Sequence, residues 1–198
     1  IVKLLNISTV LHTLNLTHTF NNKKNIEIGI GKLLCTNKTL LTLNLSFNNI
    51  GISETIEIAK ALRTNKTLHT LNLSYNNIDT EGAIEIANML STNTTLHILY
   101  LSNNDIGTEG AIEIAKMLKS NHTLHTLSLS NNDIGTEGAI EIAKMLESNY
   151  ALHTLNLGWN NIGRKQFYQP AQTEQGVEGA ISIAKMLNTN CTAMFLHM

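Results

Sequence analysis

The sequence lacks the features that mark several large classes of protein. No stretch of its 198 residues is long and apolar enough to cross a membrane, and residues 1–20 lack the charged start and apolar core of a secretory signal. The net charge is only -1, and no basic stripe is present that could neutralise phosphates. We therefore expect neither a membrane nor a nucleic acid among its partners.

Residue patterns that carry catalysis are also missing. The sequence has no strained serine elbow, no pair of catalytic carboxylates, no zinc-ligand spacing and no dinucleotide-binding glycine pattern. Residues 29–32 resemble the end of a phosphate-binding loop, but Ile26 stands where its first glycine should be, and Leu33 replaces the serine or threonine. We expect no enzymatic activity, no cofactor and no bound metal.

Cysteine and proline are scarce. Cys35 and Cys191 are the only cysteines, and they lie five repeat units apart, far beyond the ~7 Å between Cα atoms that a disulfide can bridge. A reducing, intracellular compartment is therefore expected, most simply the cytoplasm. The only proline, Pro170, falls within an insertion at 164–176.

An eleven-residue phrase recurs five times at a spacing of 28 residues. It has the form L-x-x-L-x-L-x-x-N-x-I, and its copies start at Leu40, Leu68, Leu96, Leu124 and Leu152. A unit this short cannot bury its own apolar face, so neighbouring copies must stack around one continuous core. The period therefore predicts a solenoid whose function lies on its surface.

Each copy continues into a second phrase that is typical of a helix. Residues 107–118 and 135–146 both have the sequence GTEGAIEIAKML, whose alanine, isoleucine and leucine residues form one apolar stripe. Thr108 and Thr136 are suited to capping the first turn. Each unit is therefore predicted to be one short strand, a turn and one helix.

The unequal widths of strands and helices predict a curved stack. Parallel strands lie about 4.8 Å apart, whereas helix axes need roughly 8 to 10 Å. Strands must then line the inside of an arc and helices the outside. The predicted fold class is α/β: a right-handed solenoid in the shape of a horseshoe arc, with parallel strands on the concave face, helices on the convex face and about six repeats.

The repeat length and the wording N-x-I-G-x-E-G-A-x-x-I-A-x-x-L resemble the ribonuclease-inhibitor-like class of leucine-rich repeats over nearly the whole chain. Within that class, residues 76–99 are most similar to the repeat arrays of NOD-like receptors. Ran GTPase-activating proteins carry related repeats. The resemblance implies a leucine-rich-repeat fold, which by itself carries many unrelated functions.

The register divides the chain into one domain whose two ends both cut through a repeat unit. We expect the end of a preceding repeat, a degenerate repeat, four regular repeats, a repeat with the insertion 164–176 and the start of a further repeat. These units cover residues 1–10, 11–39, 40–67, 68–95, 96–123, 124–151, 152–192 and 193–198. Neither end has the polar unit that normally closes an array, so we interpret the chain as a fragment of a longer one.

Equivalent positions of stacked repeats form columns along the solenoid. One column is predicted to be a structural ladder that satisfies backbone groups in the turn after each strand, and it contains Asn48, Asn76, Asn104, Asn132 and Asn160. A second column contains His12, His69, His97, His125 and His153. Copying of a surface residue explains the histidines, with metal binding and pH sensing as open alternatives.

The concave floor is predicted to be neutral, because none of the five strand segments contains Asp, Glu, Lys or Arg. Aromatic side chains are the residues most suited to bind a protein partner there or beside it. Our candidates are Tyr75, Tyr100, Trp159, Phe167 and Tyr168. Phe167 and Tyr168 lie in the insertion 164–176, for which a tolerated loop or a gene-model artefact is the alternative.

Two functions follow from the repeats and their resemblance. The first is a non-enzymatic protein-protein interaction module or scaffold. The resemblance to NOD-like receptors implies that this module is the sensing or ligand-binding repeat region of such a receptor. The alternative is a GTPase-activating regulator resembling the Ran GTPase-activating proteins, which use a catalytic arginine. Only Arg63 and Arg164 are present to serve that role.

Overall fold

The computed structural model describes residues 10–20, 29–163, 181 and 195–197. Short strands alternate with helices along the chain. The strands are β1 (Thr13–Asn15), β2 (Thr42–Asn44), β3 (Thr70–Asn72), β4 (Ile98–Tyr100), β5 (Thr126–Ser128), β6 (Thr154–Asn156) and β7 (Phe195–His197). The helices are α3 (Ile30–Thr36), α4 (Ile52–Thr64), α5 (Thr80–Leu90), α6 (Gly107–Leu118) and α7 (Gly135–Leu146).

The described strands form one parallel sheet in chain order from β1 to β7. From β2 to β6 the register repeats every 28 residues, so that Leu71 lies opposite Leu99 and Leu127 opposite Leu155. Between β1 and β2 the offset is 29 residues, because Leu14 lies opposite Leu43. Identical positions of successive repeats are therefore stacked directly on one another.

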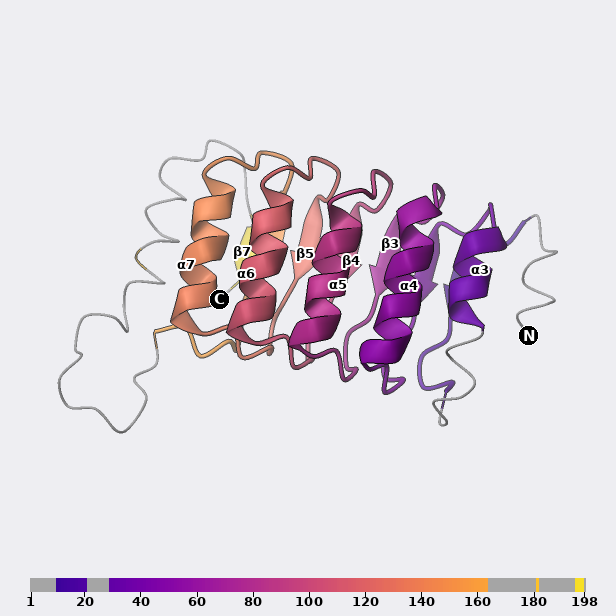
Figure 1. Ribbon diagram of the computed structural model, residues 1–198, viewed down its shortest axis with the longest axis horizontal. Coiled ribbons are helices and arrows are strands. Elements are labelled where there is room, and N and C mark those ends of the chain that lie inside the picture. The colour runs from indigo at the N-terminus through magenta and orange to yellow at the C-terminus, as the bar shows by residue number, and fades with distance from the viewer. Residues whose placement is uncertain (1–9, 21–28, 164–180, 182–194, 198) are drawn as a thin grey trace.

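The helices form a second layer that covers one face of the sheet. Figure 1 shows α3 to α7 side by side in one row, with the strands behind them. The other face of the sheet carries no helix in the described part of the chain. This arrangement confirms the predicted arc of parallel strands and covering helices.

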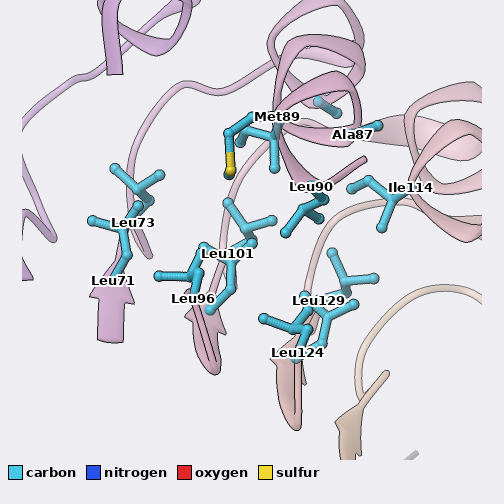
Figure 2. Packing of buried hydrophobic residues seen from close by; sticks show 14 of the residues in the cluster. Leu71, Leu73, Ala87, Met89, Leu90, Leu96, Leu101, Ile114, Leu124 and Leu129 are labelled. Carbon is cyan, nitrogen blue, oxygen red and sulfur yellow. The ribbon is translucent and has the colours of Figure 1, made fainter. Parts of the chain in front are cut away.

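The core lies between the two layers and continues from repeat to repeat. Figure 2 shows Leu96 and Leu101 at β4 pointing toward Leu90 of α5, with the leucines of the neighbouring repeats beside them. The central leucine of every strand from β2 to β6 is buried, as are the aliphatic residues on the inner side of each helix. The three-residue strands owe their stability to this shared core, since so short a strand cannot stand alone.

The starts of α6 and α7 differ from the expected capping by threonine. Neither helix has a side-chain cap; each is preceded by an isoleucine and begins at a glycine with a positive φ, 69° at Gly107 and 68° at Gly135. The hydroxyl of Thr108 instead donates to the carbonyl oxygen of Ile134 in the next repeat, at 2.8 Å. The prediction of threonine caps is therefore wrong, because this hydroxyl bonds between repeats and not within its own helix.

Candidate functional site

The exposed face of the sheet consists of the outer residues of each strand. In β2, β3, β4 and β6 the first and third residues are half-buried while the central leucine is buried. Threonine and asparagine occupy most of these positions, and Ile98 with Tyr100 in β4 forms an apolar patch among them. The floor is therefore polar but uncharged, with one apolar region near its middle.

Strand asparagines on this floor are held by the turns that follow them. The Oδ1 atoms of Asn15, Asn44, Asn72 and Asn156 accept the backbone N–H two residues further on, at 2.9 to 3.0 Å. Their acceptor oxygens are thus engaged inside the protein. The side-chain NH2 groups are what these residues can offer to a partner.

A row of side chains borders the floor at the ends of the strands, and we call it the aromatic column. Its members share a positive φ between 53° and 61°, and they are His18, Phe47, Tyr75, Asn103, Asn131 and Trp159. Phe47 stacks on His18 and on Tyr75, with ring centroids 4.5 and 4.1 Å apart. The exposed fractions of Phe47, Tyr75 and Trp159 are 41%, 48% and 81%.

The structure brings some of the candidate binding residues together and keeps others apart. Tyr75 and Trp159 occupy the same column, but Asn103 and Asn131 separate them and bond to each other at 2.8 Å between Nδ2 and Oδ1. Tyr100 lies on the floor, in the strand that pairs with β3 and β5. Phe167 and Tyr168, with the rest of the insertion 164–176, lie outside the described residues.

A second row borders the opposite edge, where the chain enters the strands, and we call it the histidine stack. It consists of His69, His97, His125 and His153, whose ring centroids are 5.0, 5.1 and 5.4 Å apart in chain order. Leu41 occupies the equivalent place before β2 and separates His12 from the stack. Burial, followed by the neighbouring His97 and His153, lowers the pKa of His125, while the Thr123 backbone opposes the shift.

The asparagines of the predicted ladder make a continuous set of hydrogen bonds between repeats. The Nδ2 atom of Asn104 donates to the carbonyl oxygens of Leu73 and Leu101, at 3.1 and 2.9 Å, and its Oδ1 accepts from the backbone of Ile78 at 3.0 Å. The equivalent Nδ2 bonds recur at Asn48, Asn76, Asn132 and Asn160. The Oδ1 atom of Asn132 is buried without a partner, for which the structure offers no reason.

A second asparagine ladder was missed by the sequence reasoning. It lies in the turns that lead into the strands and consists of Asn37, Asn65, Asn93, Asn121 and Asn149, all buried. Asn93, for example, donates to the carbonyl oxygen of Leu62 in the preceding repeat at 2.6 Å, and its Oδ1 accepts from Leu96 at 2.8 Å. The signal was available, because these residues also recur every 28 positions in N-x-T-L or its variants.

Charged side chains lie on the outer helices. Lys116 pairs with Glu113 and Lys144 with Glu141, each at 2.6 Å, and Arg63 pairs with Glu85 at 3.2 Å. These pairs lie at the surface and are partly exposed, so they contribute little to stability. Among the described residues no group of three or more His, Cys, Asp or Glu is placed to hold a metal ion, and no helix is long and apolar enough to cross a bilayer.

Comparison with known proteins identifies the repeat. The family model described as "Leucine Rich repeat" matches residues 36–51, 64–87, 92–115, 120–143 and 151–165, which together exceed half of the chain. The chain belongs to the leucine-rich repeat family. No curated protein matches its sequence.

Three solved structures share the fold of this leucine-rich repeat chain. The actin-binding site 2 of leiomodin-1 has a TM-score of 0.65 at 23% identity over 85% of this chain and 90% of its own. The C-terminal domain of tropomodulin from Caenorhabditis elegans has a TM-score of 0.62 at 14% identity, over 83% of this chain and 92% of its own. The leucine-rich repeat-containing protein LegL7 of Legionella pneumophila has 0.55 at 20% identity, over 88% of this chain and 51% of its own. At these identities the likeness shows the fold alone.

Proposed function

We propose that this chain is a non-enzymatic protein-protein interaction module that binds a folded partner on its exposed sheet face. The observation that carries the proposal is the aromatic column, which holds Phe47, Tyr75 and Trp159 exposed beside an uncovered, neutral floor. Tyrosine and tryptophan are enriched among the few residues that supply most of the binding free energy in protein interfaces. The name of one structure with the same fold, an actin-binding site, supports a protein ligand and makes actin the first partner to test.

The backbone of the column suggests how to test it without disturbing the fold. Asn103 and Asn131 hold the same positive φ as Tyr75 and Trp159, so asparagine is compatible with this turn in this chain. The variants Tyr75→Asn and Trp159→Asn therefore remove the aromatic rings and leave the turn intact. Tyr150→Asn is a matched control, because Tyr150 is an exposed tyrosine outside the column, with an exposed fraction of 63% that lies between those of Tyr75 and Trp159.

Binding of actin to the immobilised chain is measured first. Proteins of a cell extract are then captured on the chain, and the binding of each captured protein is confirmed with the purified protein. We expect the Tyr75→Asn, Trp159→Asn double variant to lose at least about tenfold in affinity, a typical effect of removing interface aromatics, while Tyr150→Asn binds as wild type. Equal binding by the double variant would show that the aromatic column is not the site. Deleting residues 164–176 tests the contribution that we also propose for Phe167 and Tyr168.

We further propose that the chain is an intracellular sensing region of a NOD-like-receptor-type protein and part of a longer array. The sequence pattern of its repeats, which resembles that of NOD-like receptors, supports this proposal. The transcript sequence on both sides of this chain tests the proposal. A nucleotide-binding domain in the same open reading frame would support a receptor. Its absence would reject the receptor proposal and would not affect the proposed role in protein binding.

The alternative of a GTPase-activating regulator finds no support in the described residues. Arg63, the one arginine among them, lies on the outer helix α4 and pairs with Glu85 of α5. Arg164 lies outside the described residues. A GTP hydrolysis assay in which the chain accelerates turnover by a small GTPase would reverse this judgement.

A further inference from the structure

Two histidines of the stack, His69 and His97, have a fixed tautomer. The Nδ1 atoms of His69 and His97 lie 2.7 and 2.6 Å from the carbonyl oxygens of Thr67 and Thr95. A carbonyl oxygen can only accept, so Nδ1 carries the proton of the neutral ring. The Nε2 atoms of these two rings then accept when the rings are neutral and donate when they are protonated. The Nδ1 atom of His125 is buried and has no hydrogen-bond partner among the described residues.

The strands that hold the stack supply no counter-ion for its protonated rings. On strands β3 to β6 and on the segments that lead into them from the helices, the titratable side chains besides the stack are Lys66, Tyr100, Lys119, His122, Glu147 and Tyr150. Glu147 is the one carboxylate among these; it directly follows α7 and is not among the groups that act on the pKa of His125. The only ionisable groups that act on the pKa of His125 are His97 and His153, both of which disfavour its charge. A carboxylate from outside would relieve this repulsion.

A metal ion suits the stack poorly. Nearly parallel rings, with interplanar angles of 16°, 5° and 23°, keep equivalent nitrogen atoms about one ring separation apart, which is 5.0 to 5.4 Å. Two imidazole nitrogens about 2.1 Å from one ion cannot lie more than about 4.2 Å apart. The geometry therefore favours separate ligand groups, one for each histidine.

The spacing of the rings matches one form of peptide. An α-helix advances about 5.4 Å per turn, whereas same-side residues of an extended strand repeat at about 6.6 Å. The ring separations are 5.0 to 5.4 Å, so a bound helix lying across the strands would place one residue per turn opposite each histidine. The same-side residues of a bound extended peptide are spaced too widely to match successive histidines. Such a helix would rest on the floor, where Ile98 and Tyr100 can contact its apolar side.

We propose that the histidine stack, in its protonated state, binds an amphipathic helix that presents one carboxylate per turn. Each protonated Nε2–H donates to one carboxylate oxygen, and the apolar side of the helix covers Ile98 and Tyr100. This inference rests on the proposed role of the sheet face in protein binding, and it adds the chemistry of the partner and a dependence on pH.

The probe is a synthetic, fluorescently labelled helical peptide of about 20 residues with one glutamate per turn along one edge and leucines beside it. The control peptide has the same composition with its glutamates moved to the opposite face. Fluorescence anisotropy is recorded at pH 7.5 and 5.5, where glutamate remains mostly ionised. We expect the first peptide to bind at least about tenfold more tightly at pH 5.5 than at pH 7.5, and to bind more tightly than the control at pH 5.5.

Variants assign the effect to the stack. The double variant His97→Gln, His125→Gln should lose the tightening at low pH, whereas His12→Gln should keep it because Leu41 separates His12 from the stack. Tightening that persists in the double variant, or equal binding of the two peptides, overturns the proposal. Circular dichroism at pH 5.5 checks that each variant is folded.

A measurement on the wild type covers the case of an unfolded variant. Imidazole C–H signals are followed by NMR across the pH range with and without the peptide. Bound carboxylates should raise the pKa of His125 above its value without the peptide, and an unchanged pKa overturns the proposal. If binding of the protein partner requires Tyr75 and Trp159 but the peptide does not bind, only the proposal for the histidine stack is rejected. If the peptide binds but the aromatic-column variants bind the protein partner as the wild type does, only the proposed aromatic site is rejected.

Discussion

Three bulky aromatic residues of this chain hold a backbone conformation that such residues rarely adopt. The φ angles of Phe47, Tyr75 and Trp159 are 59°, 56° and 61°, in the left-handed region that favours glycine and asparagine. The turn fixes this conformation through backbone bonds to the next repeat, such as that from Tyr75 N to Ser102 O at 2.8 Å. An aromatic side chain there costs conformational free energy and lies outside the buried core, which is compatible with the binding role that we propose for these residues.

The buried asparagines show the opposite case, in which a polar side chain serves the fold alone. Replacing Asn104 by alanine removes three donated bonds and one accepted bond and leaves buried backbone groups without partners. We expect the free energy of unfolding to fall by about 1 to 3 kcal/mol. Urea unfolding followed by circular dichroism measures the change.

Asn88→Ala is the control for this variant, because Asn88 is exposed on α5. Its unfolding free energy should stay within about 0.5 kcal/mol of the wild type. The second ladder is expected to behave like the first, so Asn93→Ala should be as costly as Asn104→Ala. A loss below about 0.5 kcal/mol for Asn104→Ala would contradict the structural role of the ladder.

At the scale of the element, glycine positions report how closely neighbouring helices approach. A Cβ atom on Gly110 of α6 would lie 2.8 Å from the Cβ of Ala83 on α5 and 2.8 Å from the Cγ2 of Ile106. On Gly31 of α3 it would lie 3.5 Å from Glu57, an ordinary contact. The same residue type therefore has a packing role in one helix and none in the other.

These two glycines give a paired prediction. Gly31→Ala should raise the free energy of unfolding by about 0.4 to 1 kcal/mol, because alanine restricts the unfolded chain more than glycine does. Gly110→Ala should lower it by about 1 to 3 kcal/mol, because overpacking between α5 and α6 exceeds that gain. Thermal and urea unfolding of both variants test the signs, and stabilisation by Gly110→Ala would show that the helices can separate at little cost.

At the scale of the whole molecule, the charged side chains lie on the helices and in the loops, and none lies on a described strand. The pairs on α4 to α7 lie on the outer side, while the strand segments are uncharged. A partner that approaches the exposed sheet face near neutral pH therefore meets no fixed charge on it. Surface complementarity, and not electrostatic steering, should determine association there.

This segregation predicts a weak response to salt. Between about 50 and 500 mM sodium chloride at pH 7.5, affinity for a partner bound on the sheet face should change less than about threefold. Binding of the glutamate peptide at pH 5.5 should instead weaken clearly with salt, because it depends on charged imidazoles. Surface plasmon resonance at several salt concentrations compares the two, and strong salt dependence at pH 7.5 would place the partner on the helix layer.

Stability should also depend on pH through the histidine stack. The pKa of His125 is lowered in the folded state, so between that pKa and the unfolded value near 6.5 the unfolded chain binds more protons. Stability is therefore lost as the pH falls below about 6.5. Urea unfolding at pH 7.5 and 5.5 should show a smaller loss for His125→Gln than for the wild type, and an equal loss would remove His125 as the cause.

The sequence by itself determined the repeat, the alternation of strands and helices and the arc, because a 28-residue unit must stack and its apolar pattern allows one way of stacking. It also placed the ladder asparagines and the histidines in columns. Only the tertiary structure decided how the side chains within a column contact one another. Small differences in distance and angle decide whether neighbouring rings stack and whether a hydrogen bond fixes the tautomer of a histidine. They also decide whether a threonine caps its own helix or bonds to the next repeat. Periodicity states which residues are neighbours, and packing in three dimensions sets how they meet.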